Sequence, residues 1–289
     1  MVTPHSDLIG DLSAPLEPLA THVEPDLSLL SDIRAVVFDI YGTLLISAAG
    51  DISLSEEGSS AAAMESALAA VVPDQIGSVS VWVKGYESGI IAQQQLLRER
   101  GIEWPEVDIR VVWRELAESA GLELSLEQLT ELAFRYELLS NPTWSMPGAR
   151  EVIDAIRSSG RILGIVSNAQ FYSPCLLSHY LGGELTDLGF SSAWSVYSYE
   201  NGEGKPSRNL YRKIAAQAEV EGLLPSQILY LGNDVKKDIQ PAAEVGFRTG
   251  LFAGDRRSLR TYATDPQLSK VSADIRITHW DQIPQVLGL

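Results

Sequence analysis

The chain has 289 residues, of which 45% are hydrophobic and 21% charged, as in an ordinary soluble globular protein with one large or two smaller domains. Its 22 Lys and Arg residues against 38 Asp and Glu residues leave a net charge of -16, which argues against nucleic acid as a partner. No apolar run reaches the roughly 18 residues of a membrane span, and the single cysteine, Cys175, fits a reducing compartment. We therefore expect a cytoplasmic protein with no nucleic-acid or membrane partner.

Residues 1–31 contain four prolines and no sustained hydrophobic period. This composition predicts an N-terminal extension that is draped on the body of the protein or partly disordered. We assign no chemistry to it.

The first predicted strand is the continuous apolar run Ala35–Phe38. A run of this kind suits a strand that is buried on both faces of a parallel sheet. It stops at Asp39, and Gly42 and Thr43 follow closely. Because ligands bind at the carboxyl ends of the strands in open parallel sheets, Asp39 stands where chemistry is normally done. A lone acid after a strand is more often a turn or cap residue than a catalytic one. A catalytic role for Asp39 therefore depends on further polar residues elsewhere in the chain.

Residues 48–144 carry helical patterns without a convincing strand. Apolar residues at i, i+3, i+4 and i+7 predict a helix over 64–71, and a less regular pattern predicts a second over 89–100. Pro105 suits the first position of a third helix, and Ser125 begins a fourth with capping-box spacing. We predict a separate all-helical domain over 48–144.

From residue 145 onward, helical and strand patterns alternate. The predicted strands are 162–166, 194–199, 228–231, 247–252 and 275–278, and the predicted helices are 147–159, 207–218 and 241–245. Strands separated by helices imply a parallel sheet with right-handed crossovers. We expect an α/β fold, in which 32–47 and 145–289 form a Rossmann-like, doubly wound parallel sheet and the all-helical cap domain is inserted after the first strand.

Polar groups follow four of the predicted strands. Asp39 ends the first, Ser167 ends the second, Lys205 lies after the third, and the acid-rich segment 232–238 follows the fourth. Each has an ordinary explanation as a helix cap or a solvated charge. Since parallel strands point the same way, however, these groups should converge on one edge of the sheet, and four such coincidences favour a single pocket.

The charges of this pocket predict its chemistry. Asp39, Asp234 and Asp238 would repel one another strongly without a counter-charge. A hard divalent cation resolves this, and Mg²⁺ typically takes one or two carboxylates together with substrate phosphate and water. Lys205 would add positive charge toward an anionic substrate. The pocket is therefore expected to bind a small anionic phosphoryl compound, which the Asp39 carboxylate attacks as the nucleophile.

The order of these motifs resembles the haloacid dehalogenase-like superfamily, over about residues 34–252. The motifs are Asp39-Ile40-Tyr41-Gly42-Thr43, Ser167-Asn168, Gly204-Lys205-Pro206, and Gly232-Asn233-Asp234 with Asp238. The resemblance implies a hydrolase whose helical insertion forms a lid over the pocket.

The resemblance also implies roles for the motif residues. Asp39 would be the nucleophile, with Thr43 positioning it. Gly42, Ser167 and Asn168 would bind the transferred group, Lys205 would neutralise its charge, and Asp238 would hold Lys205 or a metal-bound water.

The implied metal is Mg²⁺. Its ligands would be Asp39, Asp234 and the backbone carbonyl of Tyr41. Asn233 occupies the place where some relatives carry the acidic ligand, so the choice between Asn233 and Asp234 stays open.

One departure from the family pattern concerns Tyr41. The family's phosphatases usually carry an Asp there as general acid and base, whereas a phenol with a pKa of about 10 is a poor base at neutral pH. A tyrosine at this place resembles the family's 2-haloacid dehalogenases, which work without metal because halide leaves without a proton. We expect a Mg²⁺-dependent phosphatase of a small phosphorylated metabolite. The alternatives are a 2-haloacid dehalogenase and a catalytically decayed protein that acts in binding, and the oligomeric state stays open.

Overall fold

The structure, a computed structural model, describes residues 5–49, 57–73 and 77–289. Its body is a six-stranded sheet with the order β5-β4-β1-β6-β7-β8, and all neighbouring strands are parallel. The strands are β1 (Ala35–Phe38), β4 (Ile162–Ser167), β5 (Phe190–Tyr197), β6 (Ile228–Gly232), β7 (Arg248–Phe252) and β8 (Ile275–Ile277). The strand that carries Asp39 at its end is therefore central, as its apolar run predicts.

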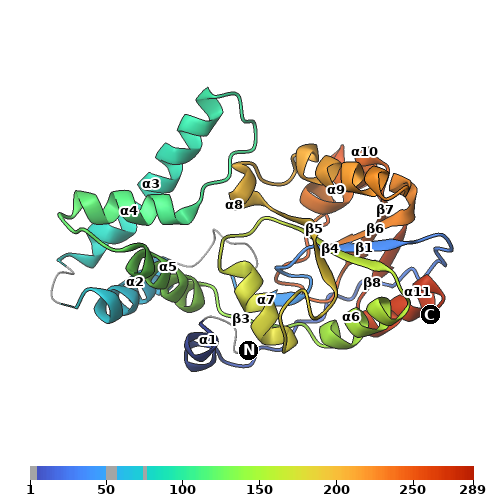
Figure 1. The fold of residues 1–289 in the computed structure, drawn as a ribbon, viewed down its shortest axis with the longest axis horizontal. Coiled ribbons are helices and arrows are strands. Elements are labelled where there is room, and N and C mark those ends of the chain that lie inside the picture. The colour runs from blue at the N-terminus through green and yellow to red at the C-terminus, as the bar shows by residue number, and fades with distance from the viewer. Residues whose placement is uncertain (1–4, 50–56, 74–76) are drawn as a thin grey trace.

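Helices cover both faces of this sheet (Figure 1). Successive residues of a strand point to opposite faces of the sheet, so the four buried residues of β1 require cover on both faces. Ala35 and Val37 belong to a buried cluster with α9 (Arg208–Val220). Val36 and Phe38 belong to a second cluster, which includes residues of the helices α6 (Ala149–Ser158), α7 (Ser173–Leu181) and α11 (Ile283–Leu287). The predicted doubly wound α/β fold is confirmed.

Four helices lie together at the left of Figure 1, beside the sheet domain and apart from the helices that cover its two faces. They are α2 (Glu57–Val71), α3 (Val79–Glu99), α4 (Ile109–Ser119) and α5 (Leu126–Ser140). The chain leaves the sheet through β2 (Leu45–Ser47) and returns through β3 (Thr143–Ser145), which pair as an antiparallel ribbon. Ser125 forms the predicted capping box at the start of α5. The helical cap is thus an insertion, although residues 50–56 and 74–76 of the predicted domain lie outside the described residues.

Two helix boundaries in the cap were predicted wrongly. Helix α3 begins at Val79, ten residues before the predicted start, and keeps Gly85 and Gly89 in its interior. A Cβ at these glycines would lie 2.5 Å from Leu116 and 2.9 Å from Val112, so their absent side chains allow α4 to approach closely.

Pro105 does not begin a helix either, because α4 begins at Ile109 behind the N-cap Asp108. Pro105 instead forms an isolated β-bridge with Glu203 of the sheet domain. This bridge fixes the α3–α4 connection beside the loop that carries Lys205.

From residue 5 onward the N-terminal extension lies against the body of the protein, which is the first of the two predicted arrangements; residues 1–4 lie outside the described part. Its helix α1 (Ser6–Leu12) buries Ile9 and contacts both α5 and α7. Further along, Asp26 pairs with Arg276 beside the edge of the sheet. Within the described residues, no helix has the length and apolar character to cross a membrane.

Candidate active site

The loops that carry the sequence motifs converge on one cavity of about 50 Å³. It is lined by Asp39, Tyr41, Asn168, Lys205, Asn233, Asp234, Lys237, Asp238, Ser258 and Arg260. Seven of these come from the predicted motifs. The convergence follows from the parallel sheet, since β1, β4 and β6 are neighbours and end at the same edge.

Asp39 follows directly after β1, and its backbone N–H donates to the carbonyl of Leu231 on β6. Its Oδ1 accepts a hydrogen bond of 2.7 Å from Ser167 Oγ and lies 2.7 Å from Lys205 Nζ. Burial raises the pKa of Asp39 to about 6, although the charge of Lys205 opposes the rise. Asp39 is therefore mostly ionised at neutral pH, as a carboxylate nucleophile has to be.

Lys205 lies between two acids, with Nζ 2.6 Å from Asp238 Oδ1 and 2.7 Å from Asp39 Oδ1. Burial alone would lower the pKa of Lys205, but the charges of Asp238 and Asp39 raise it, so the amine stays protonated. Asn168 fixes the main chain at this point, because its Oδ1 accepts from Lys205 N at 2.6 Å. The repulsion between Asp39 and Asp238 is thus compensated by Lys205, so these two acids need no metal ion between them, contrary to the prediction from the sequence.

Asp238 is fully buried, and both of its oxygens have partners. Oδ2 accepts the backbone N–H groups of Asn233 and Asp234 at 3.0 and 2.9 Å. Oδ1 lies 3.0 Å from the hydroxyl of Tyr230, a residue of β6 that the sequence suggests only as a core position. Asp238 therefore holds Lys205 and also fixes the loop that carries the candidate metal ligands.

Thr43 and Asn233 hold each other. Thr43 Oγ1 donates to Asn233 Oδ1 at 3.1 Å, so this hydroxyl contacts Asn233 rather than Asp39. Asn233 Nδ2 in turn donates to the carbonyl of Ser258 at 2.6 Å. The amide oxygen of Asn233 is therefore oriented toward the loop that follows Asp39.

Asp234 acts as an N-cap. Its Oδ1 accepts the backbone N–H groups of Lys236 and Lys237, both at 2.8 Å, and its Oδ2 accepts from the Tyr262 hydroxyl at 3.1 Å. Burial raises the pKa of Asp234, with the charge of Asp238 as the second cause. Both Asp234 oxygens thus have hydrogen-bond partners, although the residue lines the cavity.

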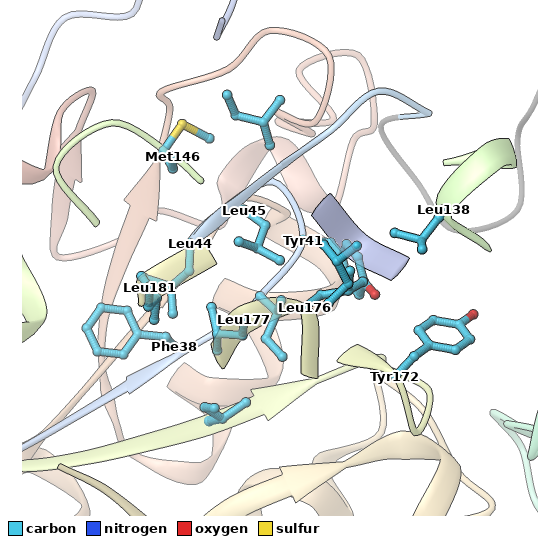
Figure 2. Packing of buried hydrophobic residues seen from close by; sticks show 14 of the residues in the cluster. Phe38, Tyr41, Leu44, Leu45, Leu138, Met146, Tyr172, Leu176, Leu177 and Leu181 are labelled. Carbon is cyan, nitrogen blue, oxygen red and sulfur yellow. The ribbon is translucent and has the colours of Figure 1, made fainter. Parts of the chain in front are cut away.

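The Tyr41 side chain packs into a hydrophobic cluster, where Figure 2 shows it near Leu45 and Leu176. Its hydroxyl lies 2.9 Å from Ser173 Oγ on α7. Burial raises the pKa of Tyr41 well above its ordinary value, and the charge of Glu137 adds to the rise. The phenol therefore stays neutral and cannot serve as a base at neutral pH.

The donor set is of the kind that Mg²⁺ takes. Asp39, Asp234, Asn233 and the Tyr41 carbonyl all offer oxygen, and Mg²⁺ uses one or two carboxylates and keeps several waters. In the described part of the chain, no three His, Cys, Asp or Glu side chains form a metal cage by themselves. These residues fit Mg²⁺ as a partly hydrated ion that the protein alone does not enclose.

Three further residues line the cavity that were not predicted as site residues, namely Lys237, Ser258 and Arg260. Lys237 lies inside the fourth motif and could have been included. Ser258 and Arg260 lie in the loop after β7, beyond the last motif. Arg260 pairs with the motif loop through its backbone, since its N–H donates to Asn233 O at 3.0 Å and its carbonyl accepts from Val235 N. No local pattern in the sequence signals this pairing.

The fold and the cavity define a class, namely α/β proteins in which loops at one edge of a parallel sheet bring carboxylates and a buried lysine to one pocket. The family follows from comparison with known proteins. A family model described as haloacid dehalogenase-like hydrolase matches residues 33–246, and the chain belongs to this family. It is an enzyme family of hydrolases, as the motifs predict.

Three known proteins illustrate the relationship. A phosphoglycolate phosphatase from Escherichia coli O157:H7 is 27% identical over 233 residues, which cover 76% of this chain and 81% of that protein. A 2-haloacid dehalogenase from Pseudomonas syringae pv. Tomato DC3000 has a similar structure, with a TM-score of 0.58 at 20% identity over 89% of this chain and 98% of that one. A HAD phosphatase from Thermococcus onnurineus gives a TM-score of 0.53 at 20% identity, with 89% and 98% coverage. The structural matches are evidence of the fold alone.

Proposed function

We propose that this hydrolase is a phosphatase of a small phosphorylated metabolite and that Asp39 is its nucleophile. The observation that carries the proposal is the arrangement of Asp39 with Ser167 Oγ and Lys205 Nζ, each 2.7 Å from the same carboxylate oxygen. A phosphoryl group placed against Asp39 would lie beside one hydroxyl and one ammonium donor. The sequence similarity to phosphoglycolate phosphatases supports phosphate ester substrates over haloacids.

In the proposed reaction, a carboxylate oxygen of Asp39 attacks phosphorus and the bond to the ester oxygen breaks, which gives an aspartyl phosphate and an alkoxide that takes a proton from water. Water then attacks this phosphorus and gives up a proton to solvent, which releases inorganic phosphate and restores the carboxylate. Ser167 and Lys205 stabilise the charge on the phosphoryl oxygens. Gly42 and Asn168 shape the pocket, and Asp238 keeps Lys205 in place.

We also propose that the enzyme uses Mg²⁺, which when bound would neutralise charge on the phosphoryl oxygens. Asp39 and the Tyr41 carbonyl would hold it, with Asn233 or Asp234 as a further oxygen donor. Calorimetry with Mg²⁺ should show binding to the parent and none to Asp39→Asn.

The same titration distinguishes Asp234 from Asn233 as the further Mg²⁺ ligand. Asp234→Asn should weaken Mg²⁺ binding by about tenfold or more if Asp234 is a ligand, since one carboxylate charge is lost. Unchanged binding would assign the position to Asn233. No binding heat at saturating Mg²⁺ in the parent would contradict the metal and favour the dehalogenase.

The two alternatives rest on Tyr41. A 2-haloacid dehalogenase needs no proton donor for its leaving group, and a decayed enzyme needs none at all. Purified protein should therefore be assayed with phosphate monoesters and with 2-haloacids, each with and without Mg²⁺. We expect phosphate release; halide release would establish the dehalogenase, and no turnover of either class would favour the binding protein.

Replacement of Tyr41 by Asp tests whether the enzyme lacks its acid-base group. The new carboxyl would be largely buried, which raises its pKa toward the range of a general acid. We expect kcat to rise by at least about tenfold for esters with poor leaving groups, such as sugar phosphates, since a positioned acid or base contributes roughly 10²–10⁴-fold. The gain should be small for p-nitrophenyl phosphate, whose leaving group hardly needs a proton.

Tyr41→Asn is the matched control, because it opens the same space without a titratable group. Mg²⁺ affinity has to be measured on both variants, since a further charge beside Asp39 can shift its pKa. If metal binding is retained and the poor esters show no gain, Tyr41 does not stand in the place of a missing acid.

A further inference from the structure

The loop between β7 and β8 places Ser258 at the cavity, although this serine belongs to none of the predicted sequence motifs. Ser258 lines the cavity together with Asp39 and Lys205, and only 1% of its surface is exposed. Within the described part of the chain, its Oγ has no hydrogen-bond partner. Buried hydroxyls in native proteins nearly always have one, so the Ser258 hydroxyl is available to a ligand that enters the cavity.

Ser258 is packed directly against the loop that follows the nucleophile. A Cβ added to Gly42 would lie 2.4 Å from Ser258 Cβ and 2.8 Å from its Oγ. Gly42 also has a φ of +74°, which residues other than glycine rarely adopt. Gly42 thus leaves the space in which Ser258 sits. The carbonyl of Ser258 accepts from Asn233 Nδ2, so the residue is tied to two motif loops at once.

The position of Ser258 depends on contacts of the three residues that precede it in the loop. Asp255 is 1% exposed; its Oδ1 accepts from the backbone N–H of Arg257 at 3.0 Å, and its Oδ2 lies 2.9 Å from the Arg257 guanidinium. The N-terminal extension adds two bonds, from Leu19 N to Asp255 Oδ1 and from Arg256 N to Leu19 O. These contacts hold the backbone of the loop, including Ser258, whose N–H donates to the carbonyl of Asp255 at 3.2 Å, so the serine is placed before a ligand arrives.

We propose that Ser258 Oγ donates a hydrogen bond to the oxyanion that binds in this cavity, and that Ser258 is a phosphoryl-binding residue of the enzyme. The proposal rests on the proposed phosphatase function. A phosphoryl oxygen suits this hydroxyl because an ionised phosphate only accepts hydrogen bonds, and Ser258 has a proton to donate. The loop after β7 thereby becomes a fifth segment of the active site.

The test replaces Ser258 with alanine and measures the binding of inorganic phosphate by calorimetry, together with thermal unfolding without phosphate. Loss of a hydrogen bond to a charged group should raise the Kd for phosphate by about tenfold or more. The Tm should stay the same or rise, because the variant removes a buried polar group that has no partner among the described protein residues.

Ser47→Ala is the matched control, since Ser47 is equally buried but donates to Asn141 Oδ1 at 2.8 Å, outside the cavity. It should lower the Tm and leave the Kd for phosphate unchanged. A Kd of the Ser258→Ala variant within twofold of the parent would overturn the inference while leaving the phosphatase proposal intact. If the parent itself binds no phosphate, both proposals fail.

Discussion

Asp39→Asn is expected to abolish turnover of phosphate esters, by at least roughly 10³-fold in kcat, because the amide has almost the size of the carboxylate but cannot attack phosphorus. The fold should persist, since the amide oxygen can still accept the hydrogen bond from Ser167 Oγ. Turnover of p-nitrophenyl phosphate and circular dichroism measure the two effects. Asp187→Asn, which changes an exposed acid, is the control and should retain full activity.

The pKa of Asp39 adds an expectation about stability. It is raised from 3.8 to about 6 in the folded protein by burial, so the folded state holds the proton more tightly than the unfolded one. The resulting stabilisation is complete below about pH 4 and is lost as the pH rises through about 6. At neutral pH the parent therefore carries a buried charge that the amide lacks, and the Tm of Asp39→Asn should not fall below that of the parent.

Activity of Asp39→Asn within about tenfold of the parent, beyond what deamidation restores, would contradict a covalent role for Asp39.

Lys205→Met should have the largest effect on folding. It leaves Asp39 and Asp238 buried side by side without their shared counter-charge, and removal of one partner from a buried ion pair typically costs about 3–5 kcal/mol. Asp39 would then lose the positive charge that opposes the rise of its pKa, so the loss of stability should be largest above neutral pH and smaller at pH 5. Activity should be lost as well.

Urea unfolding at pH 5 and pH 8 measures this dependence. Lys270→Met changes an exposed lysine and should unfold like the parent at both values. A Lys205→Met variant with the stability of the parent at pH 8 would show that the three charges do not depend on one another.

The convergence of the motifs could be predicted from the sequence because it depends on strand direction alone. Asp39, Ser167 and the segment 232–238 follow neighbouring parallel strands, so their order in the chain places them at one edge. The hydrogen bonds between the motif side chains at this edge could not be predicted. Whether Thr43 contacts Asp39 or Asn233 depends on side-chain directions that no period reveals.

Features that depend on packing between distant segments also escaped prediction. Gly85 and Gly89 suggest a helix boundary locally, yet they lie inside α3 because α4 packs against them. The N-terminal extension lacks a period of its own and is ordered by its contacts with α7 and with the loop after β7. Ser258 reaches the cavity through the same kind of long-range contact.

The central claim is that Asp39 forms a covalent phosphoryl intermediate. The most direct measurement is mass spectrometry of peptides from enzyme that is quenched with acid during turnover of p-nitrophenyl phosphate. We predict that the peptide containing Asp39 carries the added mass of one phosphoryl group in the parent and not in Asp39→Asn. A phosphoryl group on a different residue, or steady turnover of the ester with the Asp39 peptide never modified, would contradict the account.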